Sequence, residues 1–392
     1  MSGTSLDGLD VALCKIEDSG SKTKVTLVAF ETVEYDNNFK DEIRQIFAKR
    51  DIDFQQLTLL NAWIGIQHAE MIKSCLHKWG IPTEGVDLIA SHGQTVFHTP
   101  KILHKIEKFP NATLQIGDGD HIAVKTDIIT ISDFRQKHIA AGGEGAPLAM
   151  YGDYFIFSKK GENRVMLNMG GIANFTFLPA SLDANKVLVT DTGTGNTLID
   201  AFVRHYFPDK SFDKDAEIAS KGKVLPALLT ELKRNDFFEK SLPKTTGPEL
   251  FNIQYVENAL QCVQLSEYPL STEQAESIFD LLATLTYFSA ETITDTLKSL
   301  FKDMNMSEKE ISEVKIFTSG GGTHNPLLMK WIKELLPSPQ YFTTSELNIN
   351  PDAKEAILFA ILANECVAGG NTSFGNREGV PSVAMGKISF PN

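Results

Sequence analysis

Four short polar segments of this chain combine glycine with hydroxyl, amide or carboxylate side chains, and each adjoins a predicted strand. They are residues 2–10, 168–174, 191–196 and 319–325. Glycine has no side chain, so successive backbone N–H groups can approach a phosphate closely. In α/β folds, ligands bind on loops at the ends of strands. The four segments together favour a phosphate-bearing ligand, although any one of them could be an ordinary tight turn.

The motifs of two common nucleotide-binding folds are absent from the sequence. No GxxxxGK[ST] occurs, and no GxGxxG follows a strand in a strand–helix–strand unit. The glycine turn at residues 3–8 instead lies between predicted strands. Turns of this type, present in two halves of a chain, resemble those of the acetate and sugar kinase/Hsp70/actin superfamily, in which ATP lies in a cleft between two duplicated domains.

Composition excludes several classes of partner. The 392-residue chain has a formal net charge of −13, which repels phosphate backbones, so we expect no nucleic-acid partner. The longest apolar stretch, 356–363, is too short for a bilayer span, and no signal peptide is visible, so we expect no membrane partner. The 4 cysteines are widely separated, which is typical of free thiols in a reducing compartment. We therefore expect a cytoplasmic protein.

The elements that must position the four segments alternate between strands and helices, which predicts an α/β fold. Each half of the chain opens with a strand–turn–strand unit, so we expect an internal duplication, although no literal repeat supports it. The predicted strands are 9–16, 25–33, 86–90, 113–116, 128–132, 164–168, 174–178, 187–190, 314–318 and 340–344. The predicted helices are 54–79, one starting at 120, one ending near 207, and 272–300, 307–313, 327–336 and 352–368. Residues 209–250 are expected to be rich in loops.

Whole motifs, in order along the chain, are similar to those of the anhydro-N-acetylmuramic acid kinase family. No single motif is decisive, but the ordered set covers essentially the whole chain. The motifs lie at residues 2–10, 92–95, 114–118, 133–135, 145–147, 168–174, 191–196, 214–216, 243–247 with 251–252, 320–322 with 325–328, and 355–356 with 359–360.

The resemblance implies a fold and a reaction. The fold would be a duplicated ribonuclease-H-like pair of domains, with domain I at 1–135 plus 352–392 and domain II at 136–351. The reaction would be hydrolytic opening of the 1,6-anhydro ring of 1,6-anhydro-N-acetylmuramic acid, with transfer of the ATP γ-phosphoryl group to O6. The product would be N-acetylmuramic acid 6-phosphate, formed in cell-wall recycling. A homodimer is expected from the frequency of two-fold oligomers.

The resemblance places the catalytic base at Asp191. Water is a poor nucleophile at neutral pH and needs a base. Asp191 is expected to follow a strand and to open a glycine loop, so its carboxylate could project into a cleft. The alternative is an aspartate that only caps the turn.

The other predicted roles divide between the two substrates. Mg²⁺ is expected to arrive with ATP, oriented by Asp7 or Asp10, without a metal site built from the protein alone. On the sugar side, Arg135 could pair with a carboxylate or phosphate, and the alternative for it is a structural salt bridge. His92 could equally be a structural histidine, and Glu355 could simply favour the start of its helix. The predicted substrate-binding residues are His92, Gln94, Thr95, Asp118, Arg135 and Glu355. The predicted ATP-binding residues are Gly3, Thr4, Ser5, Leu6, Asp7, Gly8, Leu9, Asp10, Gly170, Gly171, Asn174, Gly193, Gly195, Asn196, Gly320, Gly321, Gly322 and Asn325.

The sequence departs from the family pattern in three places. Glu144 stands where we expect glutamine, and Thr194 where proline is usual. The third departure is that Met1 directly adjoins the first glycine turn, whereas family members carry a short apolar strand before it. We expect this first strand to be missing from the fold and the natural reading frame to begin upstream; an in-frame stop codon just before Met1 would contradict this.

Two other functions remain open at this point. One is another sugar or carboxylate kinase of the same superfamily. The other is a nucleotide-binding relative without catalysis, which would bind ATP without sugar-dependent turnover. A pure sensor would not need a sugar pocket, so Asp191 together with the segments 92–95 and 133–135 argues against it.

Overall fold

The computed structural model describes residues 1–2, 6–146, 148–247, 249–263, 275–347, 350, 352–370, 372–375 and 379–392. The chain forms two compact units. Unit 1 comprises Met1–Ser158, Leu182–Lys186 and Ile349–Asn392, and unit 2 comprises Lys159–Ser181 and Val187–Asn348. The domain boundaries given above stay a prediction, and the segment 136–158 belongs to unit 1, where α6 (Ala149–Phe157) packs against α13 (Lys354–Ala368).

Unit 2 is built on a five-stranded sheet in the order β11–β10–β7–β8–β9. The strands β7, β10 and β11 run parallel, and β8 is antiparallel to both of its neighbours. Three antiparallel strands continued by two parallel ones form a ribonuclease-H-like sheet, so the α/β prediction is confirmed. The strands are β7 (Arg164–Met169), β8 (Ile172–Leu178), β9 (Leu188–Thr194), β10 (Lys315–Ser319) and β11 (Gln340–Thr343).

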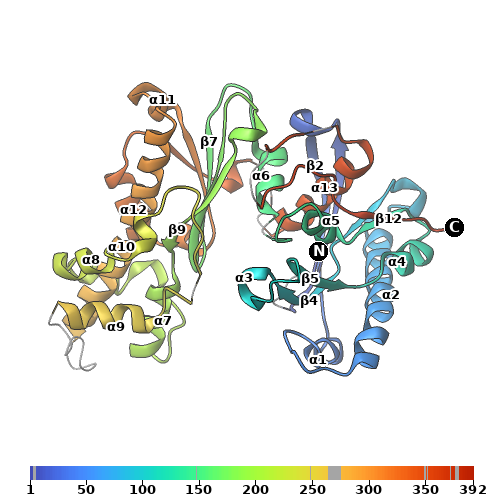
Figure 1. The fold of residues 1–392 in the computed structure, drawn as a ribbon, viewed down its shortest axis with the longest axis horizontal. Helices are drawn as coiled ribbons and strands as arrows, with labels where there is room; N and C mark the ends of the chain where they lie inside the picture. Colours follow the sequence, from blue (N-terminus) through green and yellow to red (C-terminus); the bar gives the residue numbers. More distant parts are fainter. Residues whose placement is uncertain are drawn as a thin grey trace. The chain divides into compact units, whose positions relative to one another are not determined.

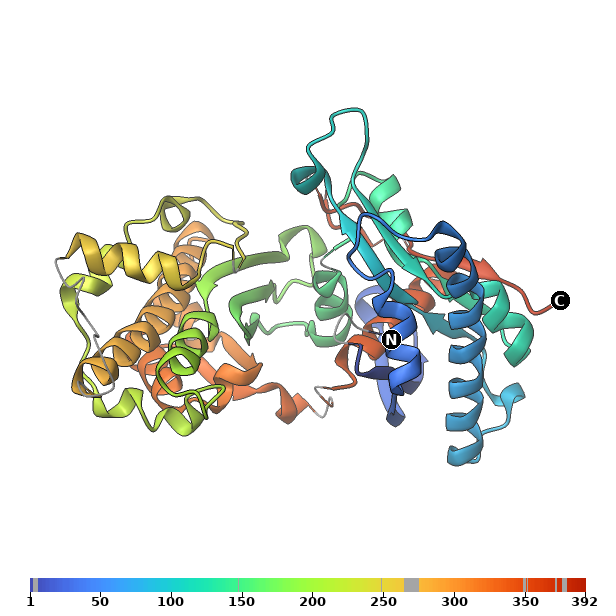
Figure 2. The same ribbon diagram turned by 90° about the horizontal axis from the view of Figure 1, so that it is seen from below.

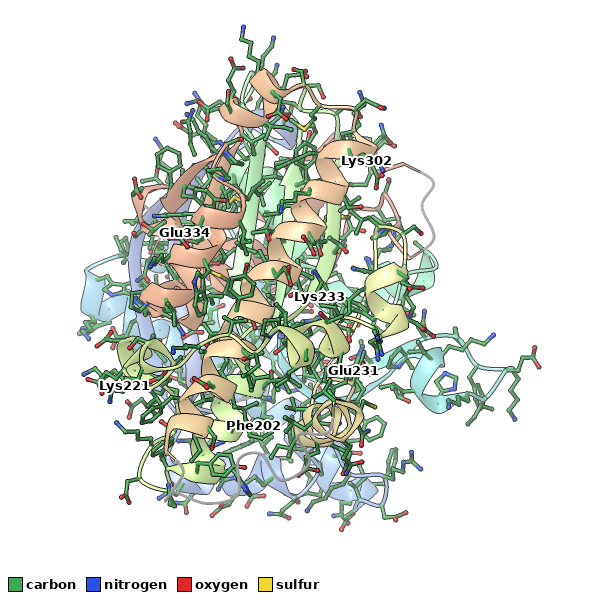
Figure 3. The ribbon with its side chains drawn as sticks, turned by 90° about the vertical axis from the view of Figure 1, so that its left-hand side faces the viewer. Phe202, Lys221, Glu231, Lys233, Lys302 and Glu334 are labelled. Carbon is green, nitrogen blue, oxygen red and sulfur yellow. The ribbon has the colours of Figure 1, made fainter. Side chains whose placement is uncertain are left out.

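The helices of unit 2 cover this sheet and extend beyond it. The long helix α10 packs on β8, β9 and α12, and its apolar side chains join two core clusters (Figure 1). Figure 3 looks onto α10, whose last turn is marked by Lys302. The helices are α7 (Thr197–Tyr206), α8 (Pro226–Leu232), α9 (Ile253–Cys262), α10 (Ala275–Asp303), α11 (Glu308–Glu313) and α12 (Pro326–Leu335).

Unit 1 contains two antiparallel hairpins and a small mixed sheet. The hairpins pair β1 with β2 and β4 with β5, and the sheet has the order β12–β6–β3, with β3 parallel to β6. The strands are β1 (Gly8–Glu17), β2 (Lys24–Glu34), β3 (Ile89–Ser91), β4 (Gln94–Thr99), β5 (Ala112–Ile116), β6 (Thr130–Ser132) and β12 (Lys387–Ser389).

The longest helix of the described part of unit 1 is α2 (Phe54–Trp79), and its bounds are those predicted (Figure 2). The carboxylate of Asp53 accepts hydrogen bonds from Gln55 N and Gln56 N at its start, and Gly80 ends it with a φ of 69°. The other helices are α1 (Asn37–Arg44), α3 (Lys101–His104), α4 (Gly119–Thr126), α5 (Phe134–Ala140), α6 and α13. Among the described helices, none combines the length and apolar character needed to cross a membrane.

Some predicted boundaries are wrong in ways that matter for the site. The strand β9 continues through Thr194, so residues 191–194 are not a loop. The strand β4 begins at Gln94, so the expected loop 91–95 is shorter. The strand β3 spans Ile89–Ser91 instead of 86–90. The helices α8 and α9 were not predicted.

Candidate functional site

A row of polar side chains crosses four strands of the unit 2 sheet. In register, Ser319 of β10 pairs with Asn168 of β7, Asn168 with Asn174 of β8, and Asn174 with Asp191 of β9. Residues that pair directly across strands project from the same face of a sheet. All four residues are half-buried, whereas most of their strand neighbours are fully buried. Asn174 and Asp191 were predicted as site residues, and Asn168 and Ser319 were not, although both lie in the glycine-rich segments.

Three of the predicted glycine segments meet at the turn between β7 and β8. Gly195 N donates to Gly171 O at 2.8 Å, and Asn196 N donates to Gly170 O at 2.9 Å. The Asn196 side chain also donates from Nδ2 to Gly170 O at 3.1 Å. A Cβ atom at position 195 would lie 2.3 Å from Gly170 O. The two backbone segments can therefore approach this closely only because residue 195 is glycine.

The glycine run after β10 packs against the same turn. Gly320 has a φ of +82°, and a Cβ there would lie 2.8 Å from Asn168 Oδ1. A Cβ at Gly322 would lie 2.7 Å from Met169 Cβ, whereas one at Gly321 would make only an ordinary contact, 3.7 Å from Asn196 Nδ2. Asn325 caps α12, since its Oδ1 accepts a hydrogen bond from Leu328 N at 2.9 Å. The structure therefore brings residues 170–171, 193–196 and 320–322 together within unit 2.

Asp191 lies within β9 and is oriented by a segment far away in the sequence. Its Oδ2 accepts a hydrogen bond from Thr246 N at 2.8 Å, and its backbone N–H donates to Lys244 O at 2.9 Å. Burial raises the pKa of the Asp191 carboxyl, Thr246 N–H lowers it and Glu249 raises it further. The segment 243–247 was part of the family resemblance but had no predicted role. Its polar composition and its two adjacent threonines were the only features of the sequence that could have indicated a place in the site.

Three buried threonine hydroxyl groups of unit 2 have no hydrogen-bond partner among the described residues. They belong to Thr194, Thr246 and Thr323. Buried polar atoms in native proteins are nearly always paired. Thr194 ends β9, Thr246 donates its backbone N–H to Asp191, and Thr323 lies in the glycine run, so each orphaned hydroxyl lies in or next to one of the segments described above.

The N-terminal loop of unit 1 is described from Leu6 onwards; Gly3, Thr4 and Ser5 lie outside the described residues. The side chains of Leu6 and Leu9 are buried in the hydrophobic core of unit 1. These two residues can therefore contact a ligand only through their backbone groups. Asp7 Oδ1 accepts a hydrogen bond from Gly8 N at 3.1 Å, and Asp10 Oδ1 accepts one from Thr32 Oγ1 at 2.6 Å. Among the described residues there is no cluster of three or more side chains that could hold a metal ion.

His92 and Arg135 form a hydrogen-bonded pair in unit 1. Arg135 Nε donates to His92 Nε2 at 2.8 Å, and His92 Nδ1 donates to Gly93 O at 2.9 Å, which sets the neutral tautomer. Burial, followed by the charge of Arg135, lowers the pKa of His92 to about 3. Arg135 Nη1 donates to Gly145 O at 2.6 Å. Burial lowers the pKa of Arg135 and the charge of Glu355 raises it, so the pair lies within electrostatic reach of the first turn of α13.

The remaining predicted substrate residues have structural partners. Gln94 is fully buried, with Oε1 accepting from Ser2 Oγ and Nε2 donating to Thr95 O at 3.1 Å. Thr95 Oγ1 accepts from Gln115 Nε2 at 3.2 Å. Asp118 caps α4, accepting a hydrogen bond from Asp120 N at 2.9 Å.

A polar cavity of about 590 Å³ brings two of the predicted substrate residues together. His92 and Asp118 both line it, with Asn61 of α2 and the ion pair between Lys387 and Asp133, whose Nζ and Oδ2 atoms are 2.5 Å apart. Gln94, Thr95, Arg135 and Glu355 are not among its lining residues. Asn61, Asp133 and Lys387 were not predicted, since they come from segments without a glycine-rich motif.

Known proteins match this chain along nearly its whole length. A model of the anhydro-N-acetylmuramic acid kinase family matches residues 1–386. A protein named anhydro-N-acetylmuramic acid kinase from Pseudoalteromonas atlantica is 54% identical over 100% of this chain and 94% of its own length. Proteins of the same name from Pseudoalteromonas translucida and Caldanaerobacter subterraneus are 50% and 37% identical over 100% of this chain, and 94% and 96% of their own lengths. The chain belongs to the anhydro-N-acetylmuramic acid kinase family.

Proposed function

We propose that Asp191 is the base that activates water in the reaction of this family. The chain is a kinase that opens the 1,6-anhydro ring of 1,6-anhydro-N-acetylmuramic acid and phosphorylates O6 at the expense of ATP. Water attacks C1, the C1–O6 bond breaks with its electron pair on O6, and the proton of water passes to the base. The observation that carries the proposal is the position of Asp191 at the end of the polar row Ser319–Asn168–Asn174–Asp191.

The surroundings of Asp191 support this role. Burial raises its pKa, which brings the carboxylate closer to the value of an effective general base at neutral pH. Thr246 N–H holds Oδ2 at 2.8 Å, which fixes the carboxylate and leaves Oδ1 to accept a hydrogen bond from water. The same N–H donor keeps the carboxylate ionised and ready before reaction.

The glycine segments of unit 2 are the proposed nucleotide side. ATP, with Mg²⁺, supplies the phosphoryl group. The backbone at Gly170 and Gly321 is the least crowded, since a Cβ there would lie no closer than 3.6 Å and 3.7 Å to another atom. The orphaned hydroxyls of Thr194 and Thr323 are the proposed hydrogen-bond donors to phosphate or ribose oxygens. In unit 1, the backbone of residues 6–10 is the proposed second phosphate contact. Asp7 or Asp10 would orient the waters of Mg²⁺ that arrives with ATP.

On the sugar side, we assign Arg135 and His92 to substrate contact and positioning. Two nitrogens of Arg135 are held by His92 and Gly145, so the guanidinium plane is fixed and its positive charge is partly desolvated. A fixed guanidinium favours a carboxylate such as the lactyl group of the muramic acid. Gln94 and Thr95, which follow His92 closely in the sequence, are held by the contacts described above, and Asp118 lines the same cavity as His92. The proposed compartment is the cytoplasm, and the proposed oligomer is a homodimer.

The function is tested by mixing the protein with Mg-ATP and 1,6-anhydro-N-acetylmuramic acid in ¹⁸O-labelled water. We expect N-acetylmuramic acid 6-phosphate and ADP, with the label on the C1 hydroxyl group and not on the phosphate. Label in the phosphate would contradict water attack at C1. Turnover of a simple hexose without turnover of the anhydro sugar would instead favour another sugar kinase activity.

A further inference from the structure

A backbone segment from elsewhere in unit 2 is attached to the outer edge of β9. In the described order of the sheet β9 is the last strand, so a strand partner pairs with it on one side only. Lys244 occupies part of the other side, where its carbonyl oxygen accepts a hydrogen bond from Asp191 N at 2.9 Å. The segment 243–247 is therefore joined to β9 at the residue that we propose as the base.

The side chain of Thr190 makes a second attachment to the same residue. Thr190 Oγ1 accepts a hydrogen bond from Lys244 N at 3.0 Å and lies 3.2 Å from Lys244 O, to which it can donate. The carbonyl oxygen of Asp191, also at 3.2 Å, is the other acceptor within its reach. Thr190 is 2% exposed, so these contacts are shielded from water. We call the contacts between Thr190 Oγ1 and the backbone of Lys244 the edge clamp.

The attached segment passes from one face of β9 to the other. Neighbouring side chains of a strand point to opposite faces, so those of Thr190 and Asp191 do. The Thr190 hydroxyl holds the backbone of Lys244, and two residues further on Thr246 N donates to Asp191 Oδ2 at 2.8 Å. Because only one residue separates the two held positions, the place of Thr246 N–H depends on where Lys244 is held.

The side chain of Lys244 is anchored independently of Thr190. Its Nζ lies 4.6 Å from the ring centre of Phe237 and 5.6 Å from that of Phe238, and a cation is attracted to the face of an aromatic ring. Lys244 is 8% exposed, and Phe237 belongs to a core cluster of unit 2. These contacts and the bond from Asp191 N would keep the segment near β9 without the Thr190 hydroxyl, so a variant that lacks this hydroxyl should still fold.

The hydrogen bond from Thr246 N affects both the charge and the orientation of the Asp191 carboxylate. A donor to the ionised form lowers the pKa of a carboxyl group, and here it opposes burial and the charge of Glu249, which both raise the pKa of Asp191. Displacing Thr246 N would weaken this bond, so the pKa of Asp191 would rise. It would also release one oxygen of the carboxylate, which could then rotate away from the direction needed to align water.

We propose that Thr190 is a positioning residue for Asp191: the edge clamp holds residues 244–246 in the place from which Thr246 N–H orients the carboxylate. This inference rests on the proposed role of Asp191 as the base. Thr190 acts through the backbone of Lys244 and Thr246 and does not itself meet the reacting atoms. Valine has nearly the shape of threonine and is at least as well suited to a strand, so packing alone would not require the hydroxyl group.

The test compares Thr190→Val, which removes the hydroxyl, with Thr190→Ser, which keeps it. Thr318→Val is the matched control, because Thr318 is 1% exposed in β10 of the same sheet and its Oγ1 donates to a backbone carbonyl oxygen, Phe342 O, at 3.1 Å. Two properties of each full-length protein are measured. One is the rate of hydrogen exchange at the Thr246 amide, and the other is the pH dependence of kcat/KM for the anhydro sugar at saturating Mg-ATP.

We expect Thr190→Val to speed exchange of the Thr246 amide by about tenfold or more. The acid limb of the pH profile should move up by about one pH unit, because a hydrogen bond to the ionised carboxylate is weakened. Thr190→Ser should restore most of both properties, and Thr318→Val should change neither. Unchanged exchange in Thr190→Val, or faster exchange with an unmoved acid limb, would overturn the proposal, as would an equal shift of the acid limb in Thr318→Val.

Failure of the proposed function gives a different result. Normal turnover by Asp191→Asn would mean that Asp191 is not the base, whatever Thr190 does. If Asp191→Asn is inactive and Thr190→Val keeps the acid limb of the unaltered protein, the function stands and the role of Thr190 falls. The exchange rate of the Thr246 amide is measured without turnover, so it reports the edge clamp in either case.

Discussion

Asp191 is held in a more rigid setting than its sequence context indicates. The glycines and threonines around it predict a loop, but β9 continues to Thr194 because its residues pair with β8, with an irregularity in register between Ala173 and Asn174. The strand places the Asp191 carboxylate on one face of the sheet, beside Asn174. A base on a strand is positioned more accurately than a base on a loop, which suits a step in which water must be aligned with one carbon atom.

Replacing Asp191 by asparagine tests the proposed base. Asparagine preserves the shape and can still accept the hydrogen bond from Thr246 N, but it cannot take up a proton from water. We expect the Asp191→Asn variant to lose at least about 10³-fold in kcat with little change in ATP affinity. Turnover measured with the anhydro sugar, and ATP binding measured by calorimetry, separate the two effects.

The matched control is Asp209→Asn, which alters an exposed aspartate of the same unit. It should retain both turnover and ATP binding. Near-normal turnover of Asp191→Asn would show that another group is the base. A parallel loss of ATP affinity would instead indicate that the carboxylate acts on the nucleotide side.

Arg135 has two fixed nitrogens, so lysine is a poor substitute for it. A lysine ammonium cannot hold His92 Nε2 and Gly145 O in the same plane. We expect Arg135→Lys to raise the KM for the sugar by about tenfold and to leave the KM for ATP unchanged. Steady-state kinetics with each substrate varied in turn checks this. Arg44→Lys, at an exposed arginine paired with Asp41, is the control, and a larger effect on ATP than on the sugar would contradict the assignment.

At the scale of elements, the glycines of unit 2 differ in how closely other backbone segments approach them, so they should differ in their tolerance of a side chain. A Cβ at position 195 would lie 2.3 Å from the carbonyl oxygen of Gly170, and neither backbone can move away without breaking a strand or turn. We expect Gly195→Ala to destabilise the protein by about 1–3 kcal/mol and to weaken ATP binding by about tenfold or more. Thermal unfolding and calorimetry measure the two effects.

Gly321 provides the control for this prediction, because it belongs to the same group of loops. The nearest atom to a Cβ at position 321 would be Asn196 Nδ2 at 3.7 Å, which is an ordinary contact. Gly321→Ala should therefore change stability by less than about 0.5 kcal/mol. If the two variants behaved alike, the tight packing of the turn at Gly170 would not be what positions these loops.

Local signals decide which elements the sequence predicts. The helix α2 was predicted to its final residue because its apolar residues recur at helical spacing, and in the structure Asp53 and Gly80 cap its two ends. The helix α9 (Ile253–Cys262) was not predicted, although Val256, Ala259 and Leu260 are buried at helical spacing; it is only ten residues long and directly follows a polar region. Pairing between strands is decided by tertiary structure, so the extension of β9 to Thr194 and the start of β4 at Gln94 were not accessible from local patterns.

The same distinction applies to the site. Glycine-rich segments can be found in the sequence, and the structure brings residues 170–171, 193–196 and 320–322 together; their role in binding ATP stays a prediction. The contact between Asp191 and Thr246 joins residues 55 positions apart, so it depends on how the chain folds back along β9. The cavity lined by Asn61, Asp133 and Lys387 draws its residues from three distant segments, which have no shared local pattern.

At the scale of the whole molecule, buried histidines make stability depend on pH. Burial lowers the pKa of His68 and of His92 to about 3 and that of His138 to about 4; the charge of Arg135 contributes at His92 and His138. As the pH falls below 6.5, the unfolded chain binds protons at these positions and the folded chain does not. Their contribution to stability is therefore complete above pH 6.5 and is lost as the pH falls towards 4 and 3. Asp200, whose pKa burial raises to about 6, acts with the opposite sign between pH 3.8 and 6 and offsets part of the loss.

The slope of unfolding free energy against pH is proportional to the number of protons taken up on unfolding. The contribution of one histidine can therefore be measured by substituting it and comparing the slopes. His138 Nδ1 accepts a hydrogen bond from Gly145 N at 3.0 Å, and a glutamine carbonyl oxygen is a suitable replacement acceptor. Between pH 6 and 5, where unfolded histidine is largely protonated, His138→Gln should lower the slope by about 1.4 kcal/mol per pH unit, the value for one proton. Urea unfolding at a series of pH values measures the slope directly, and the difference between variants cancels the opposing contribution of Asp200. An unchanged slope in His138→Gln would mean that this histidine becomes protonated in the folded protein as readily as in the unfolded chain, and that the space around it admits a charge.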